Sequence, residues 1–189
     1  MNNRFLIVTI GASAGSLPAI IEFFDRIPAD TNAAFVVVTH LMRDRRSRLD
    51  EILALHSSLP VLRVENDIAI LPATIYILPE SRYITFENDT LRVQPREVAP
   101  INHAIDIFLN SLAENSGHTG IAVILSGGGK DGLEGGTALG KAGGKVLVQE
   151  PASAQVDALP STIIKYDHPD SVQEPGELAD LVLKLIEEN

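Results

Sequence analysis

The sequence predicts an α/β fold built on a mainly parallel sheet, with a small antiparallel hairpin beside it. Short apolar runs alternate with segments of helical periodicity, in the order expected of βαβ units. The apolar runs are hydrophobic at nearly every position, as in parallel strands that are buried on both faces. With 189 residues and 45% hydrophobic content, the chain has enough apolar matter for one domain, residues 1–189.

The first two strand and helix pairs are the clearest elements. Residues 5–10 form an apolar run that the glycine-containing segment 11–15 breaks, and residues 17–26 then have the spacing of a helix. Residues 34–39 are rich in valine and predict a second buried strand, while residues 47–56 return to helical spacing. These four elements establish the βαβ alternation.

The rest of the chain adds strands, helices and one hairpin. We expect the hairpin where Asn88-Asp89 separates two short runs, because these residues favour tight turns. The predicted strands are residues 61–64, 75–78, 83–87, 90–93, 121–125 and 146–148. The predicted helices are residues 105–113, 133–142 and about 177–188.

Composition excludes several classes of function. The formal net charge of -10 argues against a nucleic-acid partner, because attraction to phosphates requires a basic surface. Without cysteines the chain has no disulfide framework and no thiolate metal site, and we predict neither metal nor cofactor. No apolar run has the roughly 18 residues of a membrane helix, and the first residues lead directly into a strand. We therefore expect a cytoplasmic protein without membrane insertion.

Three predicted strands are each followed by a different reactive side chain. Ser13 follows the first strand, His40 the second, and Asp131 the strand at residues 121–125. The carboxyl ends of parallel strands share one edge of a sheet, so these residues can converge there. A serine hydroxyl needs a base such as histidine, and the imidazole needs a carboxylate to orient it. The spacing thus predicts a serine hydrolase with Ser13, His40 and Asp131 as catalytic residues.

Each of the three residues also has a simpler interpretation. Ser13 lies in Gly11-Ala12-Ser13-Ala14-Gly15, which also describes a helix cap or a phosphate-binding turn. His40 is otherwise a strand-end residue bonded to a carbonyl, and Asp131 a helix cap in a glycine-rich turn. The order Ser, His, Asp also differs from the order Ser, Asp, His of α/β-hydrolases, which disfavours that fold.

Six sequence blocks together resemble the catalytic domain of CheB-type chemotaxis protein-glutamate methylesterases, and the resemblance covers nearly the whole chain. They are Gly11-Ala12-Ser13-Ala14-Gly15, Thr39-His40, Ser126-Gly127-Gly128-Gly129-Lys130-Asp131-Gly132, Ala142-Gly143-Gly144, Val148-Gln149-Glu150-Pro151 and Ala158-Leu159-Pro160. A further block looks like the form found where this esterase is fused to its opposing methyltransferase: Asn102-His103-Ala104-Ile105-Asp106-Ile107-Phe108.

The resemblance implies a doubly wound parallel sheet with helices on both faces and the active site at its C-terminal edge. It also implies that the triad is Ser13, His40 and Asp131, with the backbone amides of His40 and Gly128 near the reacting carbonyl. Members of the family usually have other residues at three positions, where this chain has Ala14, Ser16 and Gly128.

The implied substrates are methyl esters on glutamate side chains of chemoreceptor helices, and glutamine deamidation is a related activity. Many family members carry an N-terminal receiver domain, whereas this chain begins four residues before its first strand. We therefore expect no phosphorylation in cis. The open alternatives are constitutive activity, control by a separate receiver or methyltransferase partner, and a place within a larger fusion.

Two other classes of function compete with the esterase. A nucleotide-binding module shares the strand, glycine-rich turn and helix, but the second strand ends in His40 rather than an acid that would hold a ribose. A catalytically weak regulatory or scaffold protein is suggested by Ala14 and Gly128. The basic residues Arg43, Arg45, Arg46 and Arg48 indicate either a docking surface for an acidic partner or ordinary pairs with nearby acids.

Overall fold

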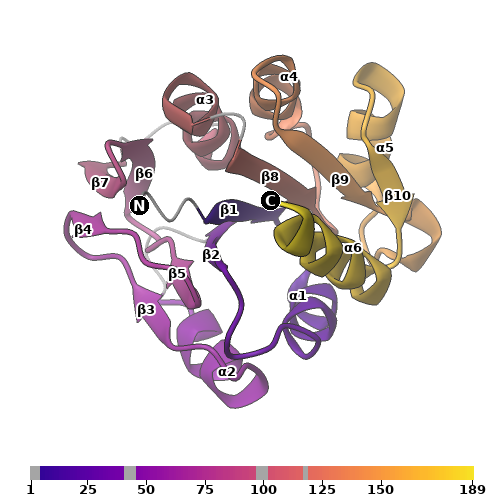
Figure 1. The fold of residues 1–189 in the computed structure, drawn as a ribbon. Coiled ribbons are helices and arrows are strands. Elements are labelled where there is room, and N and C mark those ends of the chain that lie inside the picture. Colours follow the sequence, from indigo (N-terminus) through magenta and orange to yellow (C-terminus); the bar gives the residue numbers. More distant parts are fainter. Residues whose placement is uncertain (1–4, 41–45, 97–101, 117–118) are drawn as a thin grey trace.

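The computed structural model describes residues 5–40, 46–96, 102–116 and 119–189 and contains two sheets. The main sheet has seven parallel strands in the order β10-β9-β8-β1-β2-β5-β3 (Figure 1). These strands are β1 (Leu6–Ala12), β2 (Ala33–Thr39), β3 (Val61–Arg63), β5 (Thr74–Ile77), β8 (Gly120–Ile124), β9 (Lys145–Gln149) and β10 (Ser171–Gln173). The second sheet is antiparallel and consists of β4 (Ile68–Ala69), β7 (Thr90–Pro95) and β6 (Arg82–Glu87).

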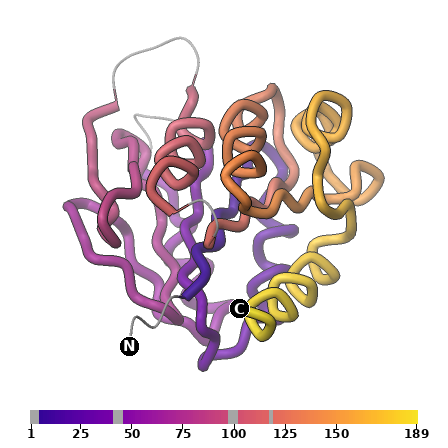
Figure 2. The backbone as a smooth tube through the Cα atoms, turned by 45° about the horizontal axis from the view of Figure 1, so that its top comes forward, coloured from indigo at the N-terminus to yellow at the C-terminus, as the bar shows by residue number. Residues whose placement is uncertain are grey.

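Helices cover both faces of the main sheet, as the predicted doubly wound fold requires (Figures 1 and 2). One face carries α1 (Leu17–Phe24), α2 (Leu49–His56) and α6 (Pro175–Glu188). The other carries α3 (Ala104–Ser116), α4 (Leu133–Lys141), α5 (Ala158–Tyr166) and the antiparallel sheet. A short 3-10 helix, η2 (Pro151–Ser153), follows β9. No helix within the described ranges is both long and apolar enough to span a membrane.

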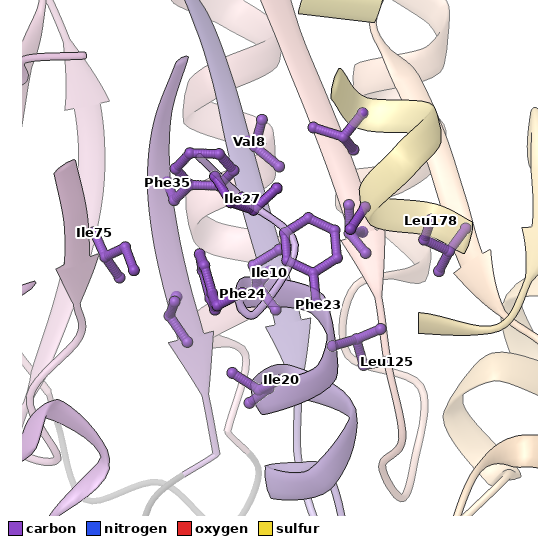
Figure 3. Close-up of a cluster of buried hydrophobic side chains, with 14 of the residues drawn as sticks. Val8, Ile10, Ile20, Phe23, Phe24, Ile27, Phe35, Ile75, Leu125 and Leu178 are labelled. Atoms are coloured by element: carbon purple, nitrogen blue, oxygen red, sulfur yellow. The ribbon is translucent and has the colours of Figure 1, made fainter. Parts of the chain in front are cut away.

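Two hydrophobic clusters separate the layers, because successive side chains of a strand point to opposite faces. In β1, Val8 and Ile10 join the cluster under α1, α2 and α6, while Ile7 joins the cluster under α3, α4 and α5. Three phenylalanine rings, Phe23, Phe24 and Phe35, lie at the centre of the first cluster in edge-to-face contacts (Figure 3). The all-apolar strands of the sequence are therefore buried on both sides.

The order of the strands reverses direction at β1. The chain passes from β1 to β2 on one side, and later returns through α3 to β8 on the other side. In open α/β sheets, ligands bind at such a switch point, outside the carboxyl ends of the strands. The segments that follow β1 and β8, which contain Ser13 and Asp131, begin at this point.

The predicted elements are present, with three differences. The hairpin turns at Asn88 and Asp89, whose φ angles are +49° and +55°, but it belongs to a three-stranded sheet that includes β4. The sequence interpretation missed α5 because Pro160 stands at its third position, which the first turn of a helix tolerates. It also missed β10, because three half-buried residues carry no periodic signal. The last helix buries its apolar stripe against the sheet, as its amphipathic pattern predicts.

The aromatic contacts of Phe35 predict a large effect of truncation. Phe35→Ala removes a fully buried ring that contacts Phe23 and Phe24, and should lower the free energy of unfolding by about 3–5 kcal/mol. Urea denaturation measures this change. As a control, Leu55→Ala alters a side chain that is 84% exposed and should change stability by about 0.5 kcal/mol or less. Equal effects of the two substitutions would contradict the packing described.

Candidate active site

Ser13, His40 and Asp131 lie at the carboxyl edge of the main sheet. The parallel register pairs Ala12, the last residue of β1, with Thr39, the last residue of β2. Ser13 and His40 therefore directly follow the ends of two adjacent strands. Asp131 lies between β8 and α4, on the other side of β1. The fold thus brings all three predicted residues to one edge.

The closest contact among the three joins the imidazole of His40 to the carboxyl group of Asp131. His40 Nε2 lies 2.5 Å from Asp131 Oδ2. The side chain of Asp131 is only 4% exposed, and it also accepts the N–H groups of Ile105 at 2.9 Å and Asp106 at 2.8 Å. Both amides belong to the first turn of α3, where backbone N–H groups lack helical acceptors. Asp131 therefore fixes the ring of His40 through Nε2 and leaves Nδ1 free of the carboxylate.

Ser13 is held at the start of the turn by its own backbone. Its N–H group donates to Ser126 O at 3.0 Å, which ties the end of β1 to the end of β8. A Cβ atom at Gly127 would lie 2.9 Å from Ser13 Cβ and 3.1 Å from Ser13 N. Only glycine permits this close approach, so position 127, directly beside the serine, requires glycine.

A buried polar network supports the same turn. Ser126 Oγ accepts the N–H of Val156 at 3.0 Å and lies 3.0 Å from Ala14 O, to which it donates. The N–H of Ser126 donates to Gln149 Oε1 at 2.8 Å, and Gln149 Nε2 donates to Ser153 Oγ at 3.1 Å. The network connects the turn after β1 with the segment after β9.

A groove of about 430 Å³ opens at this edge and includes both Ser13 and His40. Its other walls come from the starts of α1 and α2 and from Gln155, which lies in the segment after η2. The apolar lining residues are Leu17, Pro18, Ile20, Leu49 and Ile52, and the polar ones include Ser16, Thr39, Ser47, Arg48 and Gln155. No hydrogen bond joins the side chains of Ser13 and His40 among the described residues. The groove therefore offers an apolar wall beside a hydroxyl and an imidazole.

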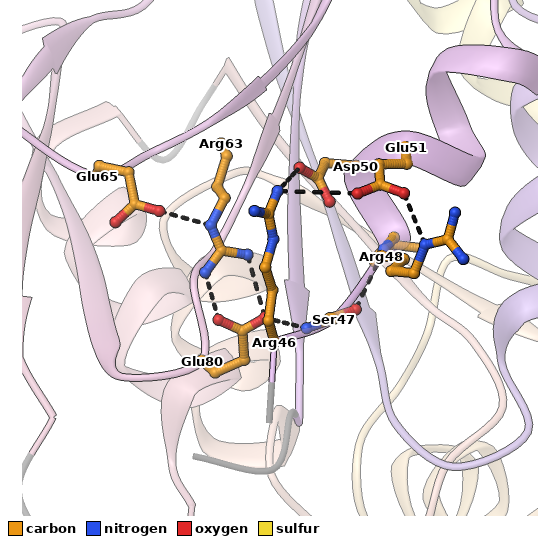
Figure 4. A network of polar contacts seen from close by, with 9 residues as sticks. Arg46, Ser47, Arg48, Asp50, Glu51, Arg63, Glu65 and Glu80 are labelled. Atoms are coloured by element: carbon orange, nitrogen blue, oxygen red, sulfur yellow. Dashed lines mark hydrogen bonds and ion pairs between the residues drawn. The ribbon is translucent and has the colours of Figure 1, made fainter. Parts of the chain in front are cut away.

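One rim of the groove is fixed by a buried ion pair (Figure 4). Glu80 pairs with Arg63 through both of its carboxylate oxygens and accepts the N–H of Ser47, which lines the groove. Burial opposes ionisation of Glu80, but the Arg63 guanidinium and the Ser47 amide outweigh it and lower the pKa of Glu80 to about 2. Glu80 raises the pKa of Arg63 in return. The strands β3 and β5 thereby hold the segment before α2.

The two predicted oxyanion amides have different surroundings. The N–H of His40 donates to Ala12 O at 3.2 Å, as a continuation of the ladder between β1 and β2. The N–H of Gly128 has no acceptor within the part of the chain that the structure describes. Gly128 also has open space where a Cβ would stand. Of the two amides, that of Gly128 is the one not engaged by the sheet.

The basic cluster forms ordinary ion pairs where it is described. Arg46 lies 3.3 Å from Asp50, and Arg48 lies 2.6 Å from Glu51 (Figure 4). These contacts agree with the interpretation of this segment as the charged start of a solvated helix. Arg43 and Arg45 lie outside the described residues.

One group of side chains has the composition of a metal site. Potential ligand atoms of His103, Asp106 and Asp131 lie within 4.8 Å of one another. However, both oxygens of Asp131 and one oxygen of Asp106 already accept backbone N–H groups. The two carboxyl groups are therefore arranged to bind helix termini, and these contacts account for their position without a metal ion.

Sequence reasoning singled out Ser13, His40 and Asp131 but missed the buried polar residues around them. Glu80, Ser126 and Gln149 are buried polar side chains at or just beyond the carboxyl ends of strands. His40 was located by the same rule, that a polar residue follows the end of a buried strand. The same rule would have found them. The supporting role of Asp106 has a different signal, an acidic residue in the first turn of a predicted helix.

Comparison with known proteins gives consistent results. A family model described as CheB methylesterase matches residues 8–182. A protein-glutamate methylesterase/protein-glutamine glutaminase of Anaeromyxobacter dehalogenans is 30% identical over 94% of this chain and 53% of its own length. One of Xanthomonas oryzae pv. oryzae is 32% identical over 95% of this chain and 51% of its own. The chain thus spans about half the length of these curated relatives.

The fold is similar to that of a solved catalytic domain. The crystal structure of the Thermotoga maritima CheB methylesterase catalytic domain superposes with a TM-score of 0.88 at 26% identity. The match covers 97% of this chain and all of that domain.

The lowered pKa of Glu80 predicts a pH-dependent contribution to stability. A shift from 4.5 to about 2, at about 1.36 kcal/mol per pH unit, amounts to roughly 3 kcal/mol at most. This stability is present above pH 4.5 and is lost as the pH falls toward 2. Glu80→Gln should therefore destabilise the protein at pH 7, and the difference from the parent should shrink in urea denaturation at pH 3.

The matched control is Glu65→Gln. Glu65 also pairs with Arg63, at 2.5 Å, but its side chain is 55% exposed, so the substitution should cost about 1 kcal/mol or less. A destabilisation by Glu80→Gln that did not change with pH would contradict the role given to this ion pair.

Proposed function

Because the chain belongs to the CheB methylesterase family, we propose that it hydrolyses methyl esters on glutamate side chains of chemoreceptors through an acyl-enzyme on Ser13. The observation that carries the proposal is the contact between His40 and the buried Asp131, beside the groove that Ser13 lines. The relatives are also named protein-glutamine glutaminase. Deamidation of glutamine would proceed through the same acyl-enzyme.

The proposed reaction begins with proton transfer from Ser13 Oγ to His40 Nδ1, the ring nitrogen that does not bond Asp131. The serine oxygen attacks the ester carbonyl, and the protonated imidazole then gives its proton to the departing methanol. Water repeats the cycle, cleaves the acyl-enzyme and leaves a glutamate carboxylate. Asp131 holds the ring with a proton on Nε2 and stabilises its positive charge in both steps.

The negative charge on the carbonyl oxygen requires backbone donors nearby. We assign the N–H of Gly128 to this role, since no described residue accepts it. The N–H of His40 would have to exchange its 3.2 Å bond to Ala12 for one to the substrate. Substrate binding must also bring Ser13 and His40 within hydrogen-bond reach, a closure that is common on formation of a Michaelis complex.

The apolar wall of the groove suits the stem of a glutamate side chain and the apolar face of the helix that carries it. Methylated chemoreceptor helices are therefore the proposed partner. A cytoplasmic location is part of the same proposal.

Substitution of the nucleophile tests the proposal. Ser13→Ala should lower the release of methanol from methyl-labelled receptor membranes by about 10⁴-fold or more, because the members of a triad act as one unit. Near-ultraviolet circular dichroism should show the fold unchanged. Parent protein should also react with a fluorophosphonate probe, and the variant should not.

The control is Ser81→Ala, which removes an exposed hydroxyl before β6 and should leave both labelling and turnover unchanged. Methanol release by Ser13→Ala at the parent rate would refute the assignment of the nucleophile. A folded parent that neither reacts with the probe nor releases methanol would instead be the catalytically weak scaffold.

A further inference from the structure

Gln155 lines the groove together with Ser13, and the backbone around it is fixed. Its neighbour Val156 donates its N–H to Ser126 Oγ at 3.0 Å, and Val156 O accepts the N–H of Gly127 at 2.9 Å. Ser126 O in turn accepts the N–H of Ser13 at 3.0 Å. A short series of hydrogen bonds therefore sets the position of Gln155 relative to the serine.

The side chain of Gln155 lies against the backbone of Gly15, two residues beyond Ser13. A Cβ atom at Gly15 would stand 2.8 Å from Gln155 Cβ and 3.1 Å from Gln155 Oε1. The φ angle of Gly15 is +71°, a conformation that residues with side chains rarely adopt. The absence of a side chain at this turn thus gives the carboxamide of Gln155 its place in the groove.

His40 and Gln155 approach Ser13 from opposite sides of β1. His40 follows β2, whereas the segment of Gln155 is bonded to the residues that follow β8, and β2 and β8 flank β1. In the proposed reaction His40 gives a proton to the departing methanol, so the methyl group leaves on the side of β2. The acyl part of the substrate, with the helix that carries it, therefore extends toward β8 and Gln155.

Gln155 also has hydrogen-bonding capacity that the fold does not use. Of the exposed residues that line the groove, two are apolar, and Arg48 lies 2.6 Å from Glu51. The carboxamide of Gln155 makes no hydrogen bond within the part of the chain that the structure describes, and the residue is exposed. A carboxamide can both donate and accept hydrogen bonds. The group is therefore available to a substrate that enters the groove.

We propose that Gln155 is a specificity-determining residue, whose carboxamide hydrogen-bonds a polar side chain one turn away from the methyl ester on the substrate helix. The main-chain N–H and C=O groups inside a helix already bond each other, so a side chain is the available partner. Residues three or four positions away share a face with the ester, with Cβ atoms about 5–6 Å apart. This inference rests on the proposed function and adds a preference for the sequence around the ester.

Two synthetic helical peptides test the preference. Each carries one glutamate methyl ester, with asparagine at the positions one turn before and after it in one peptide and alanine in the other. The parent protein should release methanol from the asparagine peptide with a kcat/KM about three- to tenfold higher, mainly through a lower KM, as expected of one neutral hydrogen bond. Gln155→Leu keeps an apolar stem but loses the carboxamide, and it should abolish the difference.

The matched control is Gln94→Leu, which makes the same change at an exposed residue of β7 and should keep the preference. Hydrolysis of p-nitrophenyl acetate, which carries no polypeptide, separates substrate contact from a structural role. Gln155→Leu should hydrolyse this ester at a rate within about twofold of the parent. An equal loss on the acetate and on both peptides would show that Gln155 acts by placing Ser13, and would overturn the proposal.

Binding provides a measurement that does not depend on turnover. Ser13→Ala should bind a fluorescently labelled asparagine peptide about three- to tenfold more tightly than the alanine peptide in anisotropy titrations. The double variant with Gln155→Leu should bind both equally. Equal affinity of Ser13→Ala for the two peptides would overturn the inference. If this preference is present but the parent releases no methanol, the proposed function fails and the contact with Gln155 stands.

Discussion

The contact of the Asp131 carboxylate with His40 and with the start of α3 is the constraint on which the site depends. A buried carboxylate is tolerated only where hydrogen bonds replace water, and Asp131 obtains them from His40, Ile105 and Asp106. The same contacts join β2, α3 and the segment before α4. Elements far apart in the chain are therefore held together by the group that orients the imidazole.

The main sheet determines where this contact can form. Reversal of strand order at β1 places the segments after β1 and β8 next to each other, and the register of β2 adds His40. The rest of the groove depends on polar side chains below the surface. Glu80 holds the rim before α2, and Ser126 holds the turn after β1. The groove is thus shaped by buried hydrogen bonds, while its apolar wall comes from helix starts.

Much of the fold was predictable because its signals are local. Apolar runs located the strands around β1, β2 and β8, and the turn at Asn88 and Asp89 located the hairpin. Pro160 concealed α5, since its tolerance at that position depends on where the helix begins. Glu80 stands just beyond β5, but its ion pair had no local signal, because its partners Arg63 and Ser47 are distant in sequence and meet it only after folding.

The sequence by itself determined the type of fold, and it predicted that Ser13, His40 and Asp131 would meet at one edge of the sheet. It could do so because strand periodicity is local and parallel strands share one edge. Only the tertiary structure decided which nitrogen of His40 meets Asp131, which amides are free, and that Asp106 and Asp131 hold each other's helices. These features depend on contacts between residues far apart in the chain, whose geometry is set by packing.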